Sequence, residues 1–196
     1  SLLDCLDIWN DKGCDGVIAL GGGSPIDLAK AVALLTSHGG SLSNYNVKTG
    51  GSAKIGKVSP QIAIPTAAGT GAEVGRACVM SLLDGSKMVA VNLNMVADLV
   101  ICDPELTIGL PPTLTAGTGL DAFAHCVEAF SSPHFHPMSQ GIALEGMRLV
   151  IEHLPRAYNQ PDDLQARGQM MAAGMMGAVA FQKGLGAIHA LSHPIG

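Results

Sequence analysis

The sequence has 196 residues, of which 47% are hydrophobic and 14% are charged, and its formal net charge at pH 7 is −5. This composition predicts a globular chain with one domain or two small ones, and it leaves no basic surface for nucleic acid or an anionic membrane. The longest apolar run, 170–181, falls short of the ~18 residues that a membrane-spanning helix needs, so we predict a buried helix there.

The first half of the chain alternates short apolar strands with helical patterns. Strands are expected at 16–20, 61–65 and 97–103, and a helix at 25–37. This alternation is typical of a layered α/β domain with a mostly parallel sheet. The stretch 37–57, rich in Gly, Ser and Asn, indicates a surface excursion. We therefore predict an α/β domain over residues 1–105.

The segment GGGSPIDLAK, residues 21–30, directly follows the first expected strand. Ser24 is expected to cap a helix, with Pro25 at its first position and Asp27 completing a capping box. Glycines let the backbone approach a ligand closely, and the free amides and dipole of a helix start favour an anion. The segment therefore predicts a site for a phosphate or pyrophosphate, with a plain tight turn as the alternative.

A second loop of this kind is IPTAAGTGAEV, residues 64–74, which runs from an apolar strand towards another expected helix. Two loops at the carboxyl ends of neighbouring strands would face one crevice, where open α/β sheets bind ligands. Thr66 and Thr70 would supply hydroxyl groups there. Lys87 could add a positive charge, although an isolated lysine is more often a solvated surface group.

The second half of the chain has no β-branched runs, and Ala, Leu, Met and Gly recur at helical spacing as far as residue 191. We predict an all-helical domain over residues 106–196. Asp121 and His125 are four residues apart, and so are His189 and His193, so each pair projects from one face of a helix.

One Asp and two His form a set that can bind a divalent cation such as Fe²⁺ or Zn²⁺ and leave positions open for a substrate. For either pair alone, a structural or exposed histidine is the more common case. The small apolar neighbours favour the metal, because unpaired Asp and His are costly to bury.

The five cysteines are odd in number and include no Cys-x-x-Cys pair, which favours free thiols in a reducing compartment. We therefore expect a cytoplasmic protein. Asp4 and Asp7 fall where a signal peptide would be basic and then apolar, so none is expected.

Four segments in order, GGGSPIDLAK, IPTAAGTGAEV, LPPTLTAGTGLDAFAHCVEAF and GLGAIHALSHPIG, resemble the iron-dependent (group III) alcohol dehydrogenase family. The resemblance implies a dehydroquinate synthase-like fold, in which an α/β dinucleotide-binding domain precedes an all-helical metal-binding domain and the active site lies in the cleft between them. The residues that it implies are Gly22, Gly23 and Ser24 for the NAD(P) pyrophosphate, Thr66, Thr70 and Lys87 for further cofactor contacts, Asp121, His125 and His189 for the metal, and His193 beside the nicotinamide and substrate.

The function that this resemblance implies is hydride transfer between a small primary or secondary alcohol and NAD or NADP. Fe²⁺, with Zn²⁺ as the alternative, would polarise the alcohol oxygen, and His193 would relay its proton. A homo-oligomer, such as a dimer, is expected. The chain departs from the family pattern at Ala67 and Gly75. We expect it to be a segment that lacks the N-terminal βαβ unit and a C-terminal part with a fourth metal-ligating histidine.

Two other functions stay open. An Asp with two His is also the metal set of non-haem Fe(II) oxygenases, although those sites normally lie on β-barrels and leave the two glycine loops unexplained. The segment could also be a catalytically silent nucleotide-binding module. Oxygen consumption with a 2-oxo acid would favour the first, and nucleotide binding without a bound metal the second.

Overall fold

In the computed structural model the described residues are 1–82 and 85–195, with side chains as far as residue 192. The chain divides into two compact units. The first consists of Ser1–Pro65 with Ala72–Ile101, and the second of Thr66–Gly71 with Cys102–Gly196. The segment Thr66–Gly71 therefore belongs with the helical part of the chain, although its neighbours in sequence belong to the α/β part.

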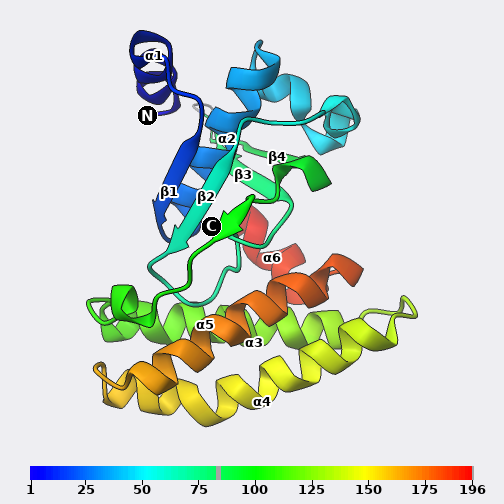
Figure 1. Ribbon diagram of the computed structural model, residues 1–196. Coiled ribbons are helices and arrows are strands. Elements are labelled where there is room, and N and C mark those ends of the chain that lie inside the picture. The colour runs from blue at the N-terminus through cyan, green and yellow to red at the C-terminus, as the bar shows by residue number, and fades with distance from the viewer. Residues whose placement is uncertain (83–84, 196) are drawn as a thin grey trace. The chain divides into compact units, whose positions relative to one another are not determined.

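The first unit contains both helices and strands (Figure 1). Its main elements are α1 (Leu2–Lys12), β1 (Val17–Gly21), α2 (Gly23–His38), β2 (Gln61–Pro65), β3 (Ala77–Ser81), β4 (Lys87–Val91) and β5 (Leu99–Val100). Short 3-10 helices occupy Leu42–Tyr45, Val47–Thr49 and Gly51–Lys54, within the stretch that was expected to be a surface excursion.

Three of the described strands form a parallel sheet in the order β1-β2-β5. Ala19 lies opposite Ala63, and Gly21 lies opposite Pro65, so β1 and β2 end at the same level. The two strands expected at 16–20 and 61–65 are confirmed to within one residue. The third, expected over 97–103, is shorter than predicted, because only Leu99 and Val100 pair with β2.

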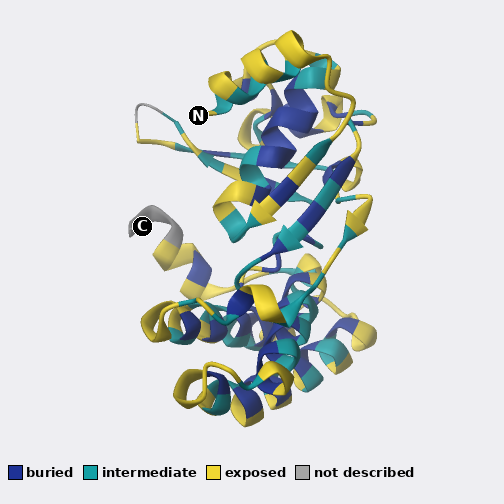
Figure 2. Cartoon of the chain, turned by 60° about the vertical axis from the view of Figure 1, so that its left-hand side comes forward, coloured by how far each residue is buried: buried dark blue, intermediate teal, exposed yellow. Residues whose placement is uncertain are grey.

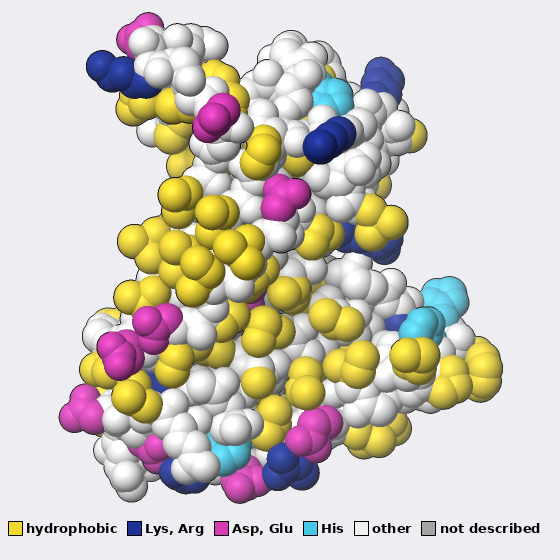
Figure 3. Space-filling model, viewed as in Figure 1, with side chains coloured by type: hydrophobic (Ala, Val, Ile, Leu, Met, Phe, Trp, Pro, Cys, Tyr) yellow, Lys and Arg dark blue, Asp and Glu magenta, His cyan; other side chains and the backbone are white. Residues whose placement is uncertain are grey.

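The two faces of this sheet differ in their cover. Helix α2 packs on one face, where Ala19 contacts Ile26 and Ala29 in a small buried cluster. On β1 the alternate residues Ile18 and Leu20 are 68% and 59% exposed, and hydrophobic side chains gather on the side shown in Figure 3. Parallel sheets are usually covered on both faces. The face of β1 that carries Ile18 and Leu20 therefore differs from the usual case, because its apolar side chains are exposed.

Strands β3 and β4 form an antiparallel pair, which the sequence analysis did not predict. The helix expected after residues 64–74 was wrong, because the chain instead bends, turns and enters β3. The reason lies in Lys30, whose Nζ donates to the carbonyl oxygens of Ala72, Gly75 and Ala77 at 2.6, 2.5 and 3.1 Å. These carbonyl oxygens therefore have a hydrogen-bond donor without the backbone forming a helix.

The predicted capping box at the start of α2 was also wrong. The helix begins at Gly23 with Gly22 as its N-cap, and no described side chain caps it. Ser24 lies inside the first turn, and Asp27 accepts a hydrogen bond from the backbone N–H of Val79 at 3.1 Å instead. The carboxylate of Asp27, which was expected to complete the capping box, therefore links α2 to β3 by a hydrogen bond.

In the described residues from 104 onwards, every element is helical, as predicted for this half of the chain. The α-helices are α3 (Pro112–Ser131), α4 (Pro137–Asn159), α5 (Leu164–Ala180) and α6 (Ala187–Ile195). In the part of the chain that the structure describes, no helix combines the length and the apolar character needed to cross a membrane. All five cysteines, each of them a described residue, are free thiols, as expected.

Small residues set the distance between helices of the second unit. A Cβ atom on Gly146 of α4 would lie 2.6 Å from the Sγ of Cys126 in α3, and one on Gly177 of α5 would lie 3.0 Å from the Cβ of His125. Buried residues alternate with exposed ones along the helices of this unit (Figure 2). The glycines therefore hold α4 and α5 close to the part of α3 that carries the candidate metal ligands.

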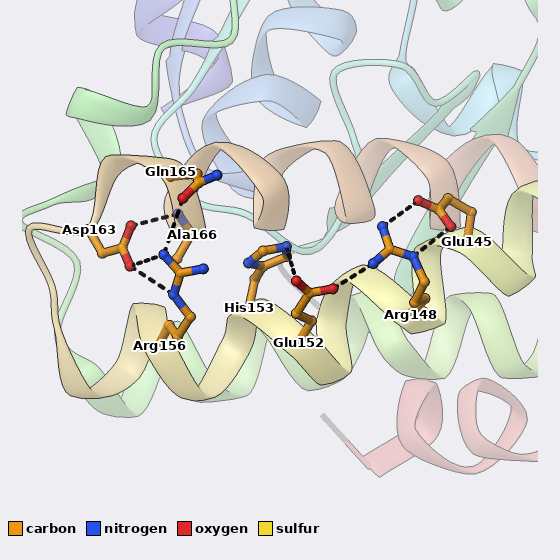
Figure 4. A network of polar contacts seen from close by, with 8 residues as sticks. All are labelled: Glu145, Arg148, Glu152, His153, Arg156, Asp163, Gln165 and Ala166. Carbon is orange, nitrogen blue, oxygen red and sulfur yellow. Dashed lines mark hydrogen bonds and ion pairs between the residues drawn. The ribbon is translucent and has the colours of Figure 1, made fainter.

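The outer side of α4 carries a row of charged contacts (Figure 4). Arg148 pairs with Glu145 at 2.7 Å and with Glu152 at 2.5 Å. Arg156 pairs with Asp163 at 2.7 Å, and Asp163 also caps α5 by accepting from the N–H of Ala166. Exposed ion pairs of this kind contribute little to stability. The Arg156–Asp163 pair spans the turn between α4 and α5, whereas the two pairs of Arg148 lie within α4.

Candidate metal and cofactor sites

The second unit brings together the three residues that the sequence suggested as metal ligands. Asp121 and His125 lie on α3, and His189 lies on α6. The Oδ1 atom of Asp121 is 3.7 Å from the Nε2 of His125 and 3.4 Å from the Nε2 of His189. One potential ligand atom from each residue lies within 4.8 Å of the others. The two imidazole rings are stacked, with centroids 4.5 Å apart.

The surroundings of these residues suit a divalent cation. Both histidines are buried, and the side chain of Asp121 is 35% exposed. Burial lowers the pKa of His125, and the nearby His189 lowers it further, while Asp121 opposes the shift. The imidazole of His125 is therefore neutral at pH 7, which is the form that offers a nitrogen lone pair to a metal. Two imidazole nitrogens and one carboxylate fit Fe²⁺ or Zn²⁺.

Glu128 is a further residue of this site, and the sequence analysis missed it. Its carboxylate accepts hydrogen bonds from the backbone N–H groups of Ile188 at 2.6 Å and His189 at 3.3 Å, and it contacts the Nδ1 atom of His189. Burial by itself raises the pKa of Glu128, but these hydrogen bonds outweigh it, so that the pKa lies below its usual value and the group is a carboxylate. Its spacing of seven positions from Asp121 and three from His125, along one helical face, is the signal that could have found it.

The glycine segment of the first unit forms the start of α2. Gly21 has φ +148°, a conformation that favours glycine, and a Cβ atom there would lie 2.6 Å from the Cγ of Pro25. Gly22 and Gly23 are half-buried, and Ser24 is exposed. The first turn of a helix has backbone N–H groups without partners in the helix, and these can donate to an anion.

Close to this segment in the sequence are the buried Lys30 and the half-buried Asp27, a pair of ionisable side chains that sequence reasoning missed too. Lys30 is 1% exposed. Burial lowers the pKa of Lys30, while Asp27 opposes the shift. Burial raises the pKa of Asp27 to about 6, against the effects of Lys30 and of the hydrogen bond from Val79. The only sequence signal was one lysine at the end of GGGSPIDLAK, which a surface helix would carry equally well.

The raised pKa of Asp27 predicts a pH-dependent cost to stability. Because the folded-state pKa of about 6 lies above the ordinary value of 3.8, stability falls as the pH rises through this interval, and the cost is complete above pH 6. Asp27→Asn cannot ionise and keeps an oxygen acceptor for the Val79 amide. We expect it to raise the free energy of unfolding by about 2 kcal/mol at pH 7.5.

Urea denaturation at pH 4 and pH 7.5 measures this effect. The gain from Asp27→Asn should shrink to less than about 1 kcal/mol at pH 4, because that pH is close to the ordinary pKa of 3.8 and the folded-state carboxyl group is protonated there. The exposed Asp11 supplies the matched control, since Asp11→Asn should change stability by less than about 0.5 kcal/mol at either pH. A gain from Asp27→Asn that is the same at both values would contradict the assigned pKa.

The remaining expected site residues lie in different elements. Thr66 and Thr70 belong to the segment Thr66–Gly71, and Lys87 is the first residue of β4. His193 lies in α6, but its side chain is outside the described residues. The roles of these four residues as cofactor or catalytic groups therefore stay predictions.

Two glycines of the segment Thr66–Gly71 serve packing within the second unit. A Cβ atom on Gly69 would collide with the backbone of Thr118 in α3, and one on Gly71 would collide with the side chain of Ala178 in α5. Glycine is therefore required here for close contact with the helices, whether or not a ligand binds.

Family models match nearly the whole chain. The model described as iron-containing alcohol dehydrogenase matches residues 1–104, and the model of the C-terminal domain of the Fe-containing alcohol dehydrogenase family matches residues 115–196. Among curated proteins, 4-hydroxybutyrate dehydrogenase of Cupriavidus necator is 50% identical over 189 residues, which are 96% of this chain and 50% of that protein.

Solved structures of similar proteins also resemble the chain over its whole length. A 1,3-propanediol oxidoreductase superposes with a TM-score of 0.92 at 34% identity, covering 100% of this chain and 51% of the other. The sulfoacetaldehyde reductase of Bifidobacterium kashiwanohense, solved in complex with NAD⁺, gives a TM-score of 0.90 at 32% identity, covering 99% of this chain and 52% of the other. The chain thus spans about half the length of the relatives that it matches.

Proposed function

The chain belongs to the iron-containing alcohol dehydrogenase family, and from this premise we infer that it forms part of a metal-dependent, NAD(P)-linked alcohol dehydrogenase. The observation that carries the proposal is the cluster of Asp121, His125 and His189, whose potential ligand atoms lie within 4.8 Å of one another. The reaction would be hydride transfer between a small primary or secondary alcohol, or the matching aldehyde or ketone, and nicotinamide.

We assign the two halves of this activity to the two parts of the chain. Residues 1–105 would form a dinucleotide-binding domain, and residues 106–196 an all-helical metal-binding domain of a dehydroquinate synthase-like fold. The parallel sheet with a glycine-rich helix start supports the first assignment. The metal cluster on α3 and α6 supports the second.

Each group of residues has one task in this proposal. Asp121, His125 and His189 hold the cation, and the chemistry that a bound Fe²⁺ or Zn²⁺ supplies is Lewis-acid polarisation of the alcohol oxygen. Gly22, Gly23 and Ser24 bind the pyrophosphate, with Thr66, Thr70 and Lys87 as further cofactor contacts. His193 would pass the alcohol proton to solvent. A cytoplasmic dimer without nucleic-acid or membrane partners remains the prediction of the sequence.

Metal analysis of the full-length protein, combined with an assay of NAD(P)-linked alcohol oxidation, tests the proposal. Stoichiometric Fe²⁺ or Zn²⁺ with alcohol-dependent NAD(P)H formation is the expected result. Oxygen consumption with a 2-oxo acid would identify a non-haem Fe(II) oxygenase instead, and nucleotide binding without metal would identify a catalytically silent module.

The cofactor assignment predicts the effect of Gly23→Val. Gly23 is not among the described glycines with positive φ, so a valine there needs no strained backbone. The branched side chain would keep a pyrophosphate away from the first-turn amides, and we expect the Kd for NAD(P)H to rise at least about 10-fold. Fluorescence titration of NAD(P)H measures this in the full-length protein.

The control for that variant is Gly141→Val in α4, because Gly141 is exposed and a Cβ atom there meets no other atom within 4 Å. It should leave cofactor affinity unchanged. If Gly23→Val is folded, keeps its metal and binds NAD(P)H as the unmodified protein does, the glycine segment is not the pyrophosphate site.

A further inference from the structure

We propose that Glu128 is a positioning residue for His189, holding the imidazole proton on Nδ1 so that Nε2 offers its lone pair to the metal. The inference rests on the proposed function, because it assigns a task within the same metal site. It is supported by an arrangement that recurs in metal centres, where a ligating histidine donates its other ring N–H to a carboxylate.

The contacts of the carboxylate set the direction of the imidazole. Glu128 Oε2 contacts the Nδ1 of His189, while Nε2 on the other side of the ring lies 3.4 Å from Asp121 Oδ1. An ionised carboxylate can only accept hydrogen bonds, so Nδ1 must carry the proton in this contact. A neutral imidazole with its proton on Nδ1 has its lone pair on Nε2, on the side of Asp121 and His125.

The two oxygens of Glu128 do different work. Oε1 accepts the backbone N–H groups of Ile188 and His189, in the first turn of α6, and Oε2 contacts the ring. Among the described side chains of α6, which end at residue 192, only His189 is buried. Glu128 therefore both attaches the helix and orients the ring, and a suitable substitution can separate these two roles.

Glu128→Gln is that substitution. Its carbonyl oxygen can replace Oε1 as the acceptor for the two backbone N–H groups, whereas the opposite orientation would set its NH₂ group against two donors. The NH₂ group then faces Nδ1, which can only accept from it, and the imidazole proton moves to Nε2. The variant should keep α6 attached, but its protonated Nε2 would no longer offer a lone pair to the metal.

The experiment uses full-length, metal-free protein with ¹⁵N-labelled histidine, and it reads the tautomer of His189 by NMR. The His189→Ala spectrum assigns the signal. In the unmodified protein the expected tautomer has the proton on Nδ1, and in Glu128→Gln it has the proton on Nε2. The Kd for Zn²⁺, measured by competition with a chelator, should rise about 10- to 100-fold in Glu128→Gln. Glu145→Gln, an exposed carboxylate on α4, is the matched control and should change neither.

The outcomes separate this inference from the proposed function. A failure of the unmodified protein to bind Zn²⁺ or Fe²⁺ would overturn the proposed function. Normal metal binding in the unmodified protein, together with unchanged Zn²⁺ affinity in folded Glu128→Gln, would overturn only the role of Glu128. If Glu128→Gln does not fold, the tautomer of the unmodified protein still decides, because a proton on Nε2 there would contradict the proposal.

Discussion

Replacing His189 with alanine is expected to remove the metal from the full-length protein and to lower kcat/KM for alcohol oxidation about 1000-fold. The estimate follows from the several kcal/mol that a catalytic metal contributes, at 1.36 kcal/mol for each factor of ten. The substitution removes one of the three donors of the cluster, the one supplied by α6. Asp121 and His125 remain, but they are neighbours on a single helix and leave one side of the site open.

Metal content by mass spectrometry and the steady-state rate should be measured on the same preparation. His134, which is exposed in the turn between α3 and α4, provides the control, since His134→Ala should keep both the metal and the rate. Stoichiometric metal in His189→Ala would exclude this residue as a ligand. Lost activity with retained metal would instead assign His189 a role in proton transfer or substrate binding.

Lys30→Met is expected to destabilise the folded state by about 3 kcal/mol or more, because three backbone carbonyl oxygens lose a donor at about 1–3 kcal/mol for each buried group left unsatisfied. Methionine keeps the length and apolar stem of lysine but lacks the Nζ group that donates to Ala72, Gly75 and Ala77. It also removes the positive charge that lowers the pKa of the half-buried Asp27. The segment between β2 and β3 would lose the three hydrogen bonds that Lys30 of α2 makes with it.

Urea denaturation of the full-length protein, followed by circular dichroism, measures the loss. Lys54→Met is the matched control, because Lys54 is exposed at the end of a 3-10 helix and its replacement should cost less than about 0.5 kcal/mol. Should Lys30→Met be as stable as Lys54→Met, the three hydrogen bonds of Lys30 would not hold this segment, and the apolar stem alone would account for its burial.

Local patterns in the sequence were enough to predict the main strands and the convergence of Asp and His side chains at the candidate metal site. The apolar runs that form β1 and β2 are bounded by glycine and proline, and a strand with such boundaries can be predicted from a few neighbouring residues. Asp121 and His125 are four residues apart, and residues at this spacing lie on the same face of any α-helix. The small apolar surroundings favoured a metal for a set of one Asp and two His, and the resemblance to the family then implied His189 rather than His193 as the ligand.

The parts that were missed depend on contacts between distant positions. Lys30 is bonded to carbonyl groups 42 to 47 residues further along the chain, and Glu128 to a helix 60 residues away. No periodicity within one helix indicates which partner such a side chain will meet. The same reason explains the false capping box, since Asp27 has the right spacing for a cap but bonds to the Val79 amide, 52 residues away.

Because the Glu128 carboxylate attaches α6 to α3, hydrogen exchange at two backbone amides can detect the detachment of α6. The N–H groups of Ile188 and His189 donate to Glu128 rather than to their own helix. They become free to exchange with deuterium whenever α6 detaches, even while α3, α4 and α5 remain packed. Their exchange rates therefore measure how often His189 leaves the candidate metal site, separately from the unfolding of the protein. Added Zn²⁺ should slow these two amides far more than the amides in the middle of α4.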